Sequence, residues 1–261
     1  MNNLNKILAS IAFLFSLVIY IWTMAPTTSF WDCGEFIATS VIMGVPHPPG
    51  TPFYLLLGNF FSQLPTFSDI GARVNLISPI FSALAVMFLY LIIVQLIEEW
   101  FGDVQSWPDC LIIYGSALIG ALTFAFTDSH WFNAVEAEVY SLSTFFTSIV
   151  VWLILKWSSN SGHSGNVRYI LIIAYMLGLA IGIHLLNLLA LPFIALIVYF
   201  NKYEFKPITF MVTMGITLLT FMIIYLGIIK GIPNIANSYG INYPIFLVLA
   251  VFSASAYAIW K

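Results

Sequence analysis

The chain has 261 residues, of which 61% are hydrophobic and 7% are charged. Its mean hydropathy of +0.98 lies far outside the range of soluble domains. Its formal net charge of −3, with no basic stripe, excludes nucleic acid as a partner. Long unbroken apolar runs, in place of alternating residues, exclude a transmembrane β-barrel. The composition therefore indicates an all-α, polytopic membrane helical bundle.

Apolar runs of the length needed to cross a bilayer, about 20 residues, occur along the whole chain. We expect about seven or eight spans, at 7–25, 74–97, 111–127, 139–157, 169–187, 188–200, 208–229 and 244–260. The run at 188–200 is short and contains Pro192, so the fifth and sixth runs either cross or form a hairpin that crosses incompletely. We treat 1–261 as a single transmembrane domain. Because the chain stops directly after an apolar run, we expect it to be a fragment of a longer protein.

Lysine and arginine in short loops predict the orientation, because they are enriched on the cytoplasmic side. A cytoplasmic N-terminus places most of the basic residues inside, namely Lys6, Lys156, Arg168, Lys202, Lys206 and Lys261. Arg73 and Lys230 then lie outside. This orientation puts two polar stretches on the outer face: a long first outer loop at 26–73 and a second outer loop at 127–140.

The first outer loop contains the most informative segment, SFWDCGEFIATSVIMGVPHPPGTPF, from Ser29 to Phe53. It carries Asp32, Glu35 and His47 in a chain where ionisable residues are rare. Carboxylates beside a membrane cost free energy unless they face water, protein or substrate. The flanking stretches FIATSVIMGV and PFYLLLGNFFSQL are apolar but too short to span. We expect both to form interfacial or re-entrant helices along the membrane surface.

Asp32 and Glu35 are three residues apart and would share one face of a helix. They could act as a general base and a partner that tunes or orients it, or bind a divalent cation with help from His47. The structural interpretation is that Ser29 or Asp32 caps a helix; we favour function, because a cap needs one such group. His47 lies in a rigid PHPPG segment that either holds the imidazole for a ligand or forms a plain turn.

The second outer loop carries Glu136 and Glu138, with Tyr140 beside them. On a helix, residues two apart point in different directions, so we expect one glutamate to face the first loop. The alternative is a solvated loop that also carries interfacial aromatic residues. Asp128 and His130 precede the two glutamates and share this uncertainty.

Three further polar residues lie near the outer ends of predicted spans. Arg73 could bind a phosphate by two parallel hydrogen bonds, or extend its charged end to the membrane surface. His184 and Asn187 could line a cavity, or hydrogen-bond a neighbouring helix. No span carries a carboxylate or lysine near its centre, which argues against an ion-coupled transporter.

Four motifs occur in order: WDCGEFIATSVIMGVPHPPGTPFYLLLG, ARVNLISPIFSALAV, FNAVEAEVYSLS and GLAIGIHLLNLLALP. They resemble a family of bacterial membrane proteins, common in Bacteroidetes and formerly of unknown function. That family is similar to the protein O-mannosyltransferases of the GT-C glycosyltransferase superfamily. Because its members are longer, the resemblance implies that this chain is the N-terminal membrane module of such a protein.

The resemblance implies a GT-C-like fold and an enzyme of the bacterial inner membrane. Such an enzyme transfers a sugar, for example mannose, from a polyprenyl-phosphate carrier to a protein Ser/Thr hydroxyl on the periplasmic face, with inversion. It implies Asp32 as the general base and Glu35 as its partner. The residues expected to bind the donor or acceptor are His47, Arg73, Glu136, Glu138, Tyr140, His184 and Asn187. Whether a divalent metal ion is required stays open.

Two other functions remain as hypotheses. A transporter or flippase of lipid-linked glycans would need a polar path across the bilayer, and the spans show little of one. A non-enzymatic membrane assembly subunit would use its aromatic surface to bind partner helices. In that second case, Asp32, Glu35 and His47 could be replaced together without a biochemical defect.

Overall fold

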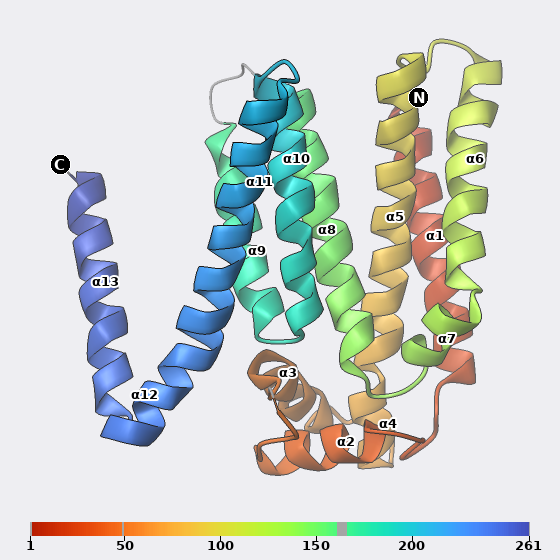
Figure 1. Cartoon of the computed structure of the whole chain (residues 1–261). Helices are drawn as coiled ribbons and strands as arrows, with labels where there is room; N and C mark the ends of the chain where they lie inside the picture. The colour runs from red at the N-terminus through yellow and green to blue at the C-terminus, as the bar shows by residue number, and fades with distance from the viewer. Residues whose placement is uncertain (1, 49, 161–165, 261) are drawn as a thin grey trace. The chain divides into compact units, whose positions relative to one another are not determined.

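The computed structural model describes residues 2–48, 50–160 and 166–260 (Figure 1). Pro49 and Lys261, which entered the sequence predictions, lie outside the described residues. Every regular element in the described part is helical, which confirms the all-α prediction. The chain packs as two compact units, Met1–Ala190 and Leu191–Lys261. A single transmembrane domain over 1–261 stays a prediction.

Within the described residues, six helical stretches are long and apolar enough to cross a membrane, and they confirm a polytopic membrane protein. They are Asn3–Thr23, Ile70–Phe101, Trp107–Ala125, Val139–Ser159, Leu185–Lys202 and Pro207–Tyr239. The fifth and eighth predicted runs also form helices, but shorter apolar ones, Val167–Ile181 and Asn242–Ala254. The difference from seven or eight expected spans is therefore one of helix length and not of helix existence.

The long helices of the first unit surround α5, which packs against α1, α6 and α8, while α9 packs on α8. Their bounds are α1 Asn2–Thr23, α5 Ile77–Phe101, α6 Trp107–Ala125, α8 Val139–Ser159 and α9 Val167–Ile181. Small buried residues such as Ala83, Ala117 and Ala121 line the contacts, because they let helix backbones approach closely. The buried Tyr20 hydroxyl donates to the Ala125 carbonyl over 2.8 Å, which fixes the register of α1 on α6.

Three short helices of the first outer loop lie together at one end of this unit, away from the start of α1 (Figure 1). They are α2 Cys33–Ile42, α3 Pro52–Ser62 and α4 Ile70–Asn75. The two helices expected around the PHPPG segment are thus confirmed as α2 and α3. They cross closely at Gly58, where an added Cβ would overlap the Ser40 hydroxyl. A glycine is needed there so that α2 and α3 can pack together.

Two boundaries differ from the sequence predictions. The stretch 127–140, predicted as a loop, contains the short helix α7, Asp128–Ala134. A helix of this length is stable only through tertiary contacts, and His130 and Ala134 are buried on its inner side. The run predicted at 169–187 ends as a helix at Ile181, so His184 and Asn187 lie in a turn after α9. Asn187 stabilises that turn by donating to the Ala180 and His184 carbonyls.

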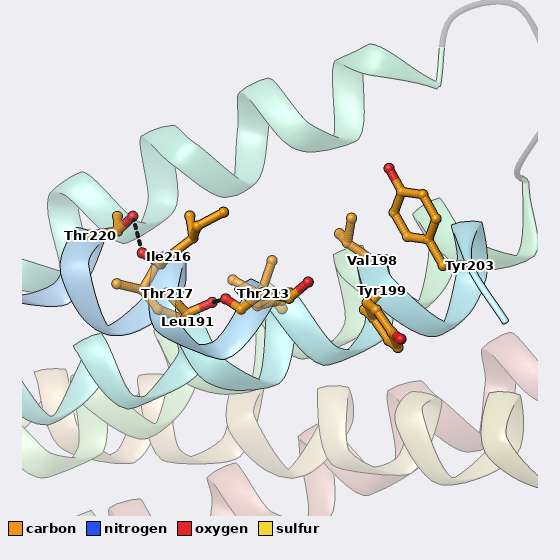
Figure 2. Close-up of a pocket in the computed structure, with 10 residues that line it drawn as sticks. Leu191, Val198, Tyr199, Tyr203, Thr213, Ile216, Thr217 and Thr220 are labelled. Carbon is orange, nitrogen blue, oxygen red and sulfur yellow. Dashed lines mark hydrogen bonds between the residues drawn. The ribbon is translucent and has the colours of Figure 1, made fainter. Parts of the chain in front are cut away.

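The second unit consists of helices in the described residues from Leu191 onward. A 3-10 turn, η1 Leu185–Leu189, precedes it, and its helices are α10 Ala190–Lys202, α11 Pro207–Met222, the π-helical η2 Ile223–Gly231, α12 Ile232–Tyr239 and α13 Asn242–Trp260. A cavity of about 320 Å³ lies between α10 and α11, and Figure 2 shows side chains that line it. Thr213 and Thr220 bond to carbonyls four residues earlier, so their hydroxyls are satisfied within the helix. None of the residues lining this cavity carries a charge.

A candidate active site on the two polar loops

Asp32, Glu35 and His47 come together as the sequence predicts, with one ligand atom from each within 4.8 Å of the others. Asp32 occupies the N-cap position of α2, yet within the described structure its side chain makes no cap hydrogen bond. Asp69, at the N-cap of α4, does accept one from the Ala72 amide, over 3.1 Å. Asp32 is therefore an exposed carboxylate that its helix does not use, which disfavours the capping interpretation.

The backbone immediately before Asp32 is strained. Trp31 has φ of 57°, a left-handed conformation that costs a bulky residue about 1–3 kcal/mol. The strained turn delivers Asp32 to the cluster at the start of α2. Strain of this kind is concentrated at functional sites, where the surrounding structure maintains it.

Glu35 holds His47 with both of its oxygens. The His47 backbone N–H donates to Glu35 Oε1 over 2.7 Å, and the ring Nδ1 meets Glu35 Oε2 at 2.7 Å. This hydrogen bond raises the pKa of His47 and lowers the pKa of Glu35, so both groups favour their charged forms. Gly50 takes a left-handed backbone conformation, with φ of 74°, and its N–H donates to the His47 carbonyl.

Glu138 approaches this cluster from the connection between α7 and α8. Its side chain is 5% exposed. Burial raises the pKa of Glu138 to about 7, and the charges of Asp32 and Glu136 add to the increase. Its charge also acts on His47, so the second polar loop faces the first. Glu136 is 1% exposed, and its Oε1 finds no hydrogen-bond partner among the described residues.

Asn75 fastens these segments together, and the sequence analysis did not identify it. Its buried side-chain amide donates to the Ala25 and Thr27 carbonyls over 2.8 and 2.9 Å. Its Oδ1 accepts from the Ala137 amide over 3.0 Å and from Cys33 Sγ over 3.6 Å. One side chain thus joins the segment before α2, α2 itself and the α7–α8 connection. Asn75 is the one side-chain amide in ARVNLISPIF, at the start of a long apolar run, and this was the available signal.

Tyr54 is a second residue that the sequence analysis missed. It is fully buried on α3, with its ring 5.4 Å from that of Phe36, which in turn lies 5.8 Å from the ring of His47. Burial raises the pKa of Tyr54, and the charge of Glu138 adds to the increase. Its hydroxyl has no hydrogen-bond partner in the described part of the chain. Tyr54 therefore forms the inner wall behind His47 and Glu138.

Arg73 points its guanidinium at the chain between α3 and α4. Its nitrogens donate to the carbonyls of Phe67, Ser62 and Ser68 over 2.6, 3.2 and 3.5 Å. These bonds explain how the loop before α4 is held. The predicted role of Arg73 in phosphate binding stays a prediction, and it would compete with these carbonyls for the same donors.

The remaining candidates form a group beside the start of α8. The ring of His184 lies 5.1 Å from that of Tyr140, two residues after Glu138. Asn187 is 2% exposed and accepts from the Ser143 and Thr147 hydroxyls while donating to two carbonyls. Since both of its N–H groups are occupied, Asn187 orders the turn after α9. Substrate binding by His184, Tyr140 and Asn187 stays a prediction.

His130 belongs to the core and not to the cluster. It is 6% exposed, and its ring lies 4.3 Å from that of Phe124. Burial lowers the pKa of His130 to about 4, so the imidazole is neutral at physiological pH.

The first unit is a bundle of apolar helices, and the loops at one end bring carboxylates and a histidine close together. These features are those of a membrane protein with an enzyme-like site. The chain belongs to the family described as "Protein O-mannosyl-transferase TMEM260 N-terminal domain", whose model matches residues 32–207. The match begins at Asp32 and includes every candidate site residue. The predicted similarity to protein O-mannosyltransferases is thereby confirmed, while a bacterial origin stays a prediction.

Two curated relatives share this resemblance. Protein O-mannosyl-transferase tmem260 of Dictyostelium discoideum is 26% identical over 155 residues, covering 58% of this chain and 17% of the relative. Protein O-mannosyl-transferase TMEM260 of Mus musculus is 26% identical over 175 residues, covering 67% of this chain and 22% of the relative. The matched region thus spans about a fifth of these relatives. No solved structure matches the chain.

Proposed function

We propose that the protein is a GT-C-type glycosyltransferase of the bacterial inner membrane. It transfers a sugar, mannose in the first instance, from a polyprenyl-phosphate carrier to a protein Ser/Thr hydroxyl on the periplasmic face. The observation that carries this proposal is the uncapped carboxylate of Asp32 beside the Glu35–His47 pair and the buried Glu138. The names of the family and of its curated relatives support transfer to a protein.

In the proposed reaction, Asp32 is the general base. It takes the proton of the acceptor hydroxyl while that oxygen forms a bond to the anomeric carbon on the face opposite the carrier phosphate. The bond between the anomeric carbon and the phosphate oxygen breaks, and its electron pair leaves with the phosphate. One displacement inverts the anomeric configuration. Asp32 suits this role because it is exposed and its helix makes no use of it.

Glu35 was predicted as the partner of Asp32, and its hydrogen bonds go instead to His47. We propose that Glu35 acts through His47, keeping the imidazolium charged and oriented toward the leaving phosphate. Glu138, whose pKa of about 7 allows a neutral carboxyl near neutral pH, would then donate a hydrogen bond to the sugar or acceptor.

A divalent cation in the same cluster is an alternative to the charged imidazole, because His47 must be neutral to act as a metal ligand. Asp32, Glu35 and His47 offer oxygen and nitrogen ligands within 4.8 Å of one another, and no lysine or arginine in the described structure forms an ion pair with these carboxylates. When bound, the cation would neutralise charge on the phosphate leaving group. Removal of metal by a chelator would test this requirement directly.

The test compares Asp32→Asn with Asp69→Asn in the full-length protein, since both aspartates occupy helix N-caps in the first outer loop. Membranes would receive radiolabelled polyprenyl-phosphate-mannose and an acceptor protein. We expect Asp32→Asn to lose about 10²–10⁴-fold in transfer rate, and Asp69→Asn to retain it. Wild-type turnover in a folded Asp32→Asn protein would refute the assignment. Glycolipid flipping without transfer in proteoliposomes would favour the flippase hypothesis.

A further inference from the structure

A groove lies at the end of the first unit opposite the carboxylate cluster. It has a volume of about 300 Å³ and follows the connection between α5 and α6, at the end where α1 begins (Figure 1). Its wall combines apolar and acidic side chains, with Asp103 and Asp109 beside Phe101, Ile112 and Ile113. The candidate active site uses none of these residues, so the groove is a separate feature of the molecule. The sequence predicts this end to be cytoplasmic.

The α5–α6 connection forms this groove with an ordered backbone. Gly102 lines it with φ of 92°, and a Cβ at this position would meet none of the described atoms within 4 Å. Val104 is 7% exposed and anchors the connection in the core. The Ser106 hydroxyl and the Asp109 carboxylate form a capping box at the start of α6. Because the wall is preformed, a partner that binds there loses little free energy to the ordering of the groove.

The acidic charge of the groove is not balanced locally. No lysine or arginine lines the groove, and no ion pair to Asp103 or Asp109 occurs among the described residues. Asp109 serves the cap of α6, whereas Asp103 is exposed and takes no part in that cap. Glu98 and Glu99 lie near the end of α5 and add charge of the same sign. The groove therefore attracts a positively charged group.

We propose that this groove binds an arginine side chain presented by a segment of a partner protein. The Asp103 carboxylate can accept two parallel hydrogen bonds from a guanidinium. Phe101 and Ile112 line the groove and are 76% and 62% exposed, so they can cover the planar face and the apolar stem of the same side chain. A volume of about 300 Å³ admits side chains and not a folded domain. The inference does not depend on the proposed function.

Two other occupants fit this groove less well. A divalent cation needs several close ligands, and the described residues hold one such group, that of Asp32, Glu35 and His47 at the other end of the unit. A phospholipid headgroup brings a phosphate, which the carboxylates around the groove would repel. An arginine on a protein segment supplies the positive charge without a phosphate, and its guanidinium matches a carboxylate in shape.

The experiment measures binding of a defined arginine peptide to the full-length protein in phosphatidylcholine nanodiscs. Fluorescence anisotropy follows a labelled amphipathic peptide of arginine and leucine, and a second peptide carries glutamine in place of arginine; empty nanodiscs give the background. We expect only the arginine peptide to bind, and to bind more weakly as salt is raised. Asp103→Asn should lower its affinity by about tenfold, because a charge-assisted hydrogen bond is lost. Glu99→Gln removes the same charge outside the lining and should change the affinity less.

A groove-filling variant separates the groove from general attraction to an acidic surface. Ile112 and Leu111 are neighbours on α6 and are 62% and 60% exposed, but only Ile112 lines the groove. Ile112→Trp should weaken binding of the arginine peptide by about tenfold, because the indole occupies its place, and Leu111→Trp should not. Unchanged affinity in a monodisperse Ile112→Trp protein, or equally tight binding of the glutamine peptide, would overturn the inference. Competition by Mg²⁺ beyond that of a monovalent salt at equal ionic strength would indicate a cation site and would also overturn it.

Discussion

The candidate site contains more acidic than basic side chains. Asp32, Glu35 and Glu138 are acidic, and His47 is the base that faces them. Arg73 gives its guanidinium to loop carbonyls. The charge of the cluster near neutral pH is therefore set by the titration of His47 and Glu138, and each can be followed separately.

The Glu35–His47 pair should be visible as a raised pKa of His47. The hydrogen bond to Glu35 raises this pKa, so Glu35→Gln should lower it toward the ordinary value of 6.5. The ion pair between Glu35 and His47 is fully formed above the lowered pKa of Glu35. It is lost as pH rises through the raised pKa of His47, because the imidazole then loses its charge. Because both side chains are well exposed, the effect on global stability should be small. NMR titration of the His47 ring would measure it, and an unchanged midpoint in Glu35→Gln would contradict the prediction.

Glu138 should make stability depend on pH in the opposite sense to an ordinary paired carboxylate. Its pKa rises from 4.5 to about 7 on folding, so the folded state binds more protons between these values. Stability should therefore fall as pH rises from 4.5 to about 7. Glu138→Gln should remove that fall, while the same change at the exposed Glu99 should not. Thermal unfolding in detergent between pH 4.5 and 8 would test it, and parallel wild-type and Glu138→Gln profiles would refute it.

At the scale of elements, the site depends on how three segments are joined, and Asn75 joins them. The segment before α2, α2 itself and the α7–α8 connection all bond to its amide. These bonds hold the carboxylates of the first and second outer loops in a fixed position relative to one another. The same logic holds at Gly58, whose missing side chain lets α2 and α3 pack together.

Asn75→Ala should destabilise the protein by about 3 kcal/mol or more, because it leaves several buried backbone groups unpaired at about 1–3 kcal/mol each. The matched control is Asn133→Ala, which removes one hydrogen bond to Ser129 within α7. Thermal unfolding and limited proteolysis between α1 and α2 would measure the difference. An Asn75→Ala protein as stable as Asn133→Ala would show that the buried amide does not join the loops.

At the scale of the whole molecule, the sequence predicts the helices well because a long apolar run is a local property. It also predicts the group of Asp32, Glu35 and His47, which lie close along the chain. It could not predict Asn75, whose hydrogen-bond partners lie 42 to 62 residues away. It missed α7 for a related reason, since so short a helix exists only through its tertiary contacts.

Orientation in the membrane is the property of the whole molecule that the proposed function needs most. In the first unit, the start of α1, the end of α8 and the start of α9 lie at one end, and α2, α3 and α4 lie at the other (Figure 1). Lys6, Lys156 and Arg168 belong to the first set of helix ends, and Arg73 belongs to α4. The fold thus places Lys6, Lys156 and Arg168 at the opposite end of the first unit from Arg73. This separation is what the positive-inside rule requires of a cytoplasmic N-terminus, and the placement of the carboxylate cluster on the outer face stays a prediction.

Cysteine labelling would test this orientation. Thr28, before α2, and Asp103, between α5 and α6, are both exposed, and the native Cys33 and Cys110 are buried. In spheroplasts, a membrane-impermeant maleimide should label Thr28→Cys at once and Asp103→Cys only after the membrane is broken. The opposite pattern would place Asp32 and His47 in the cytoplasm, where a periplasmic acceptor could not reach them. The proposed reaction would then have to be abandoned even if the residues of the site were assigned correctly.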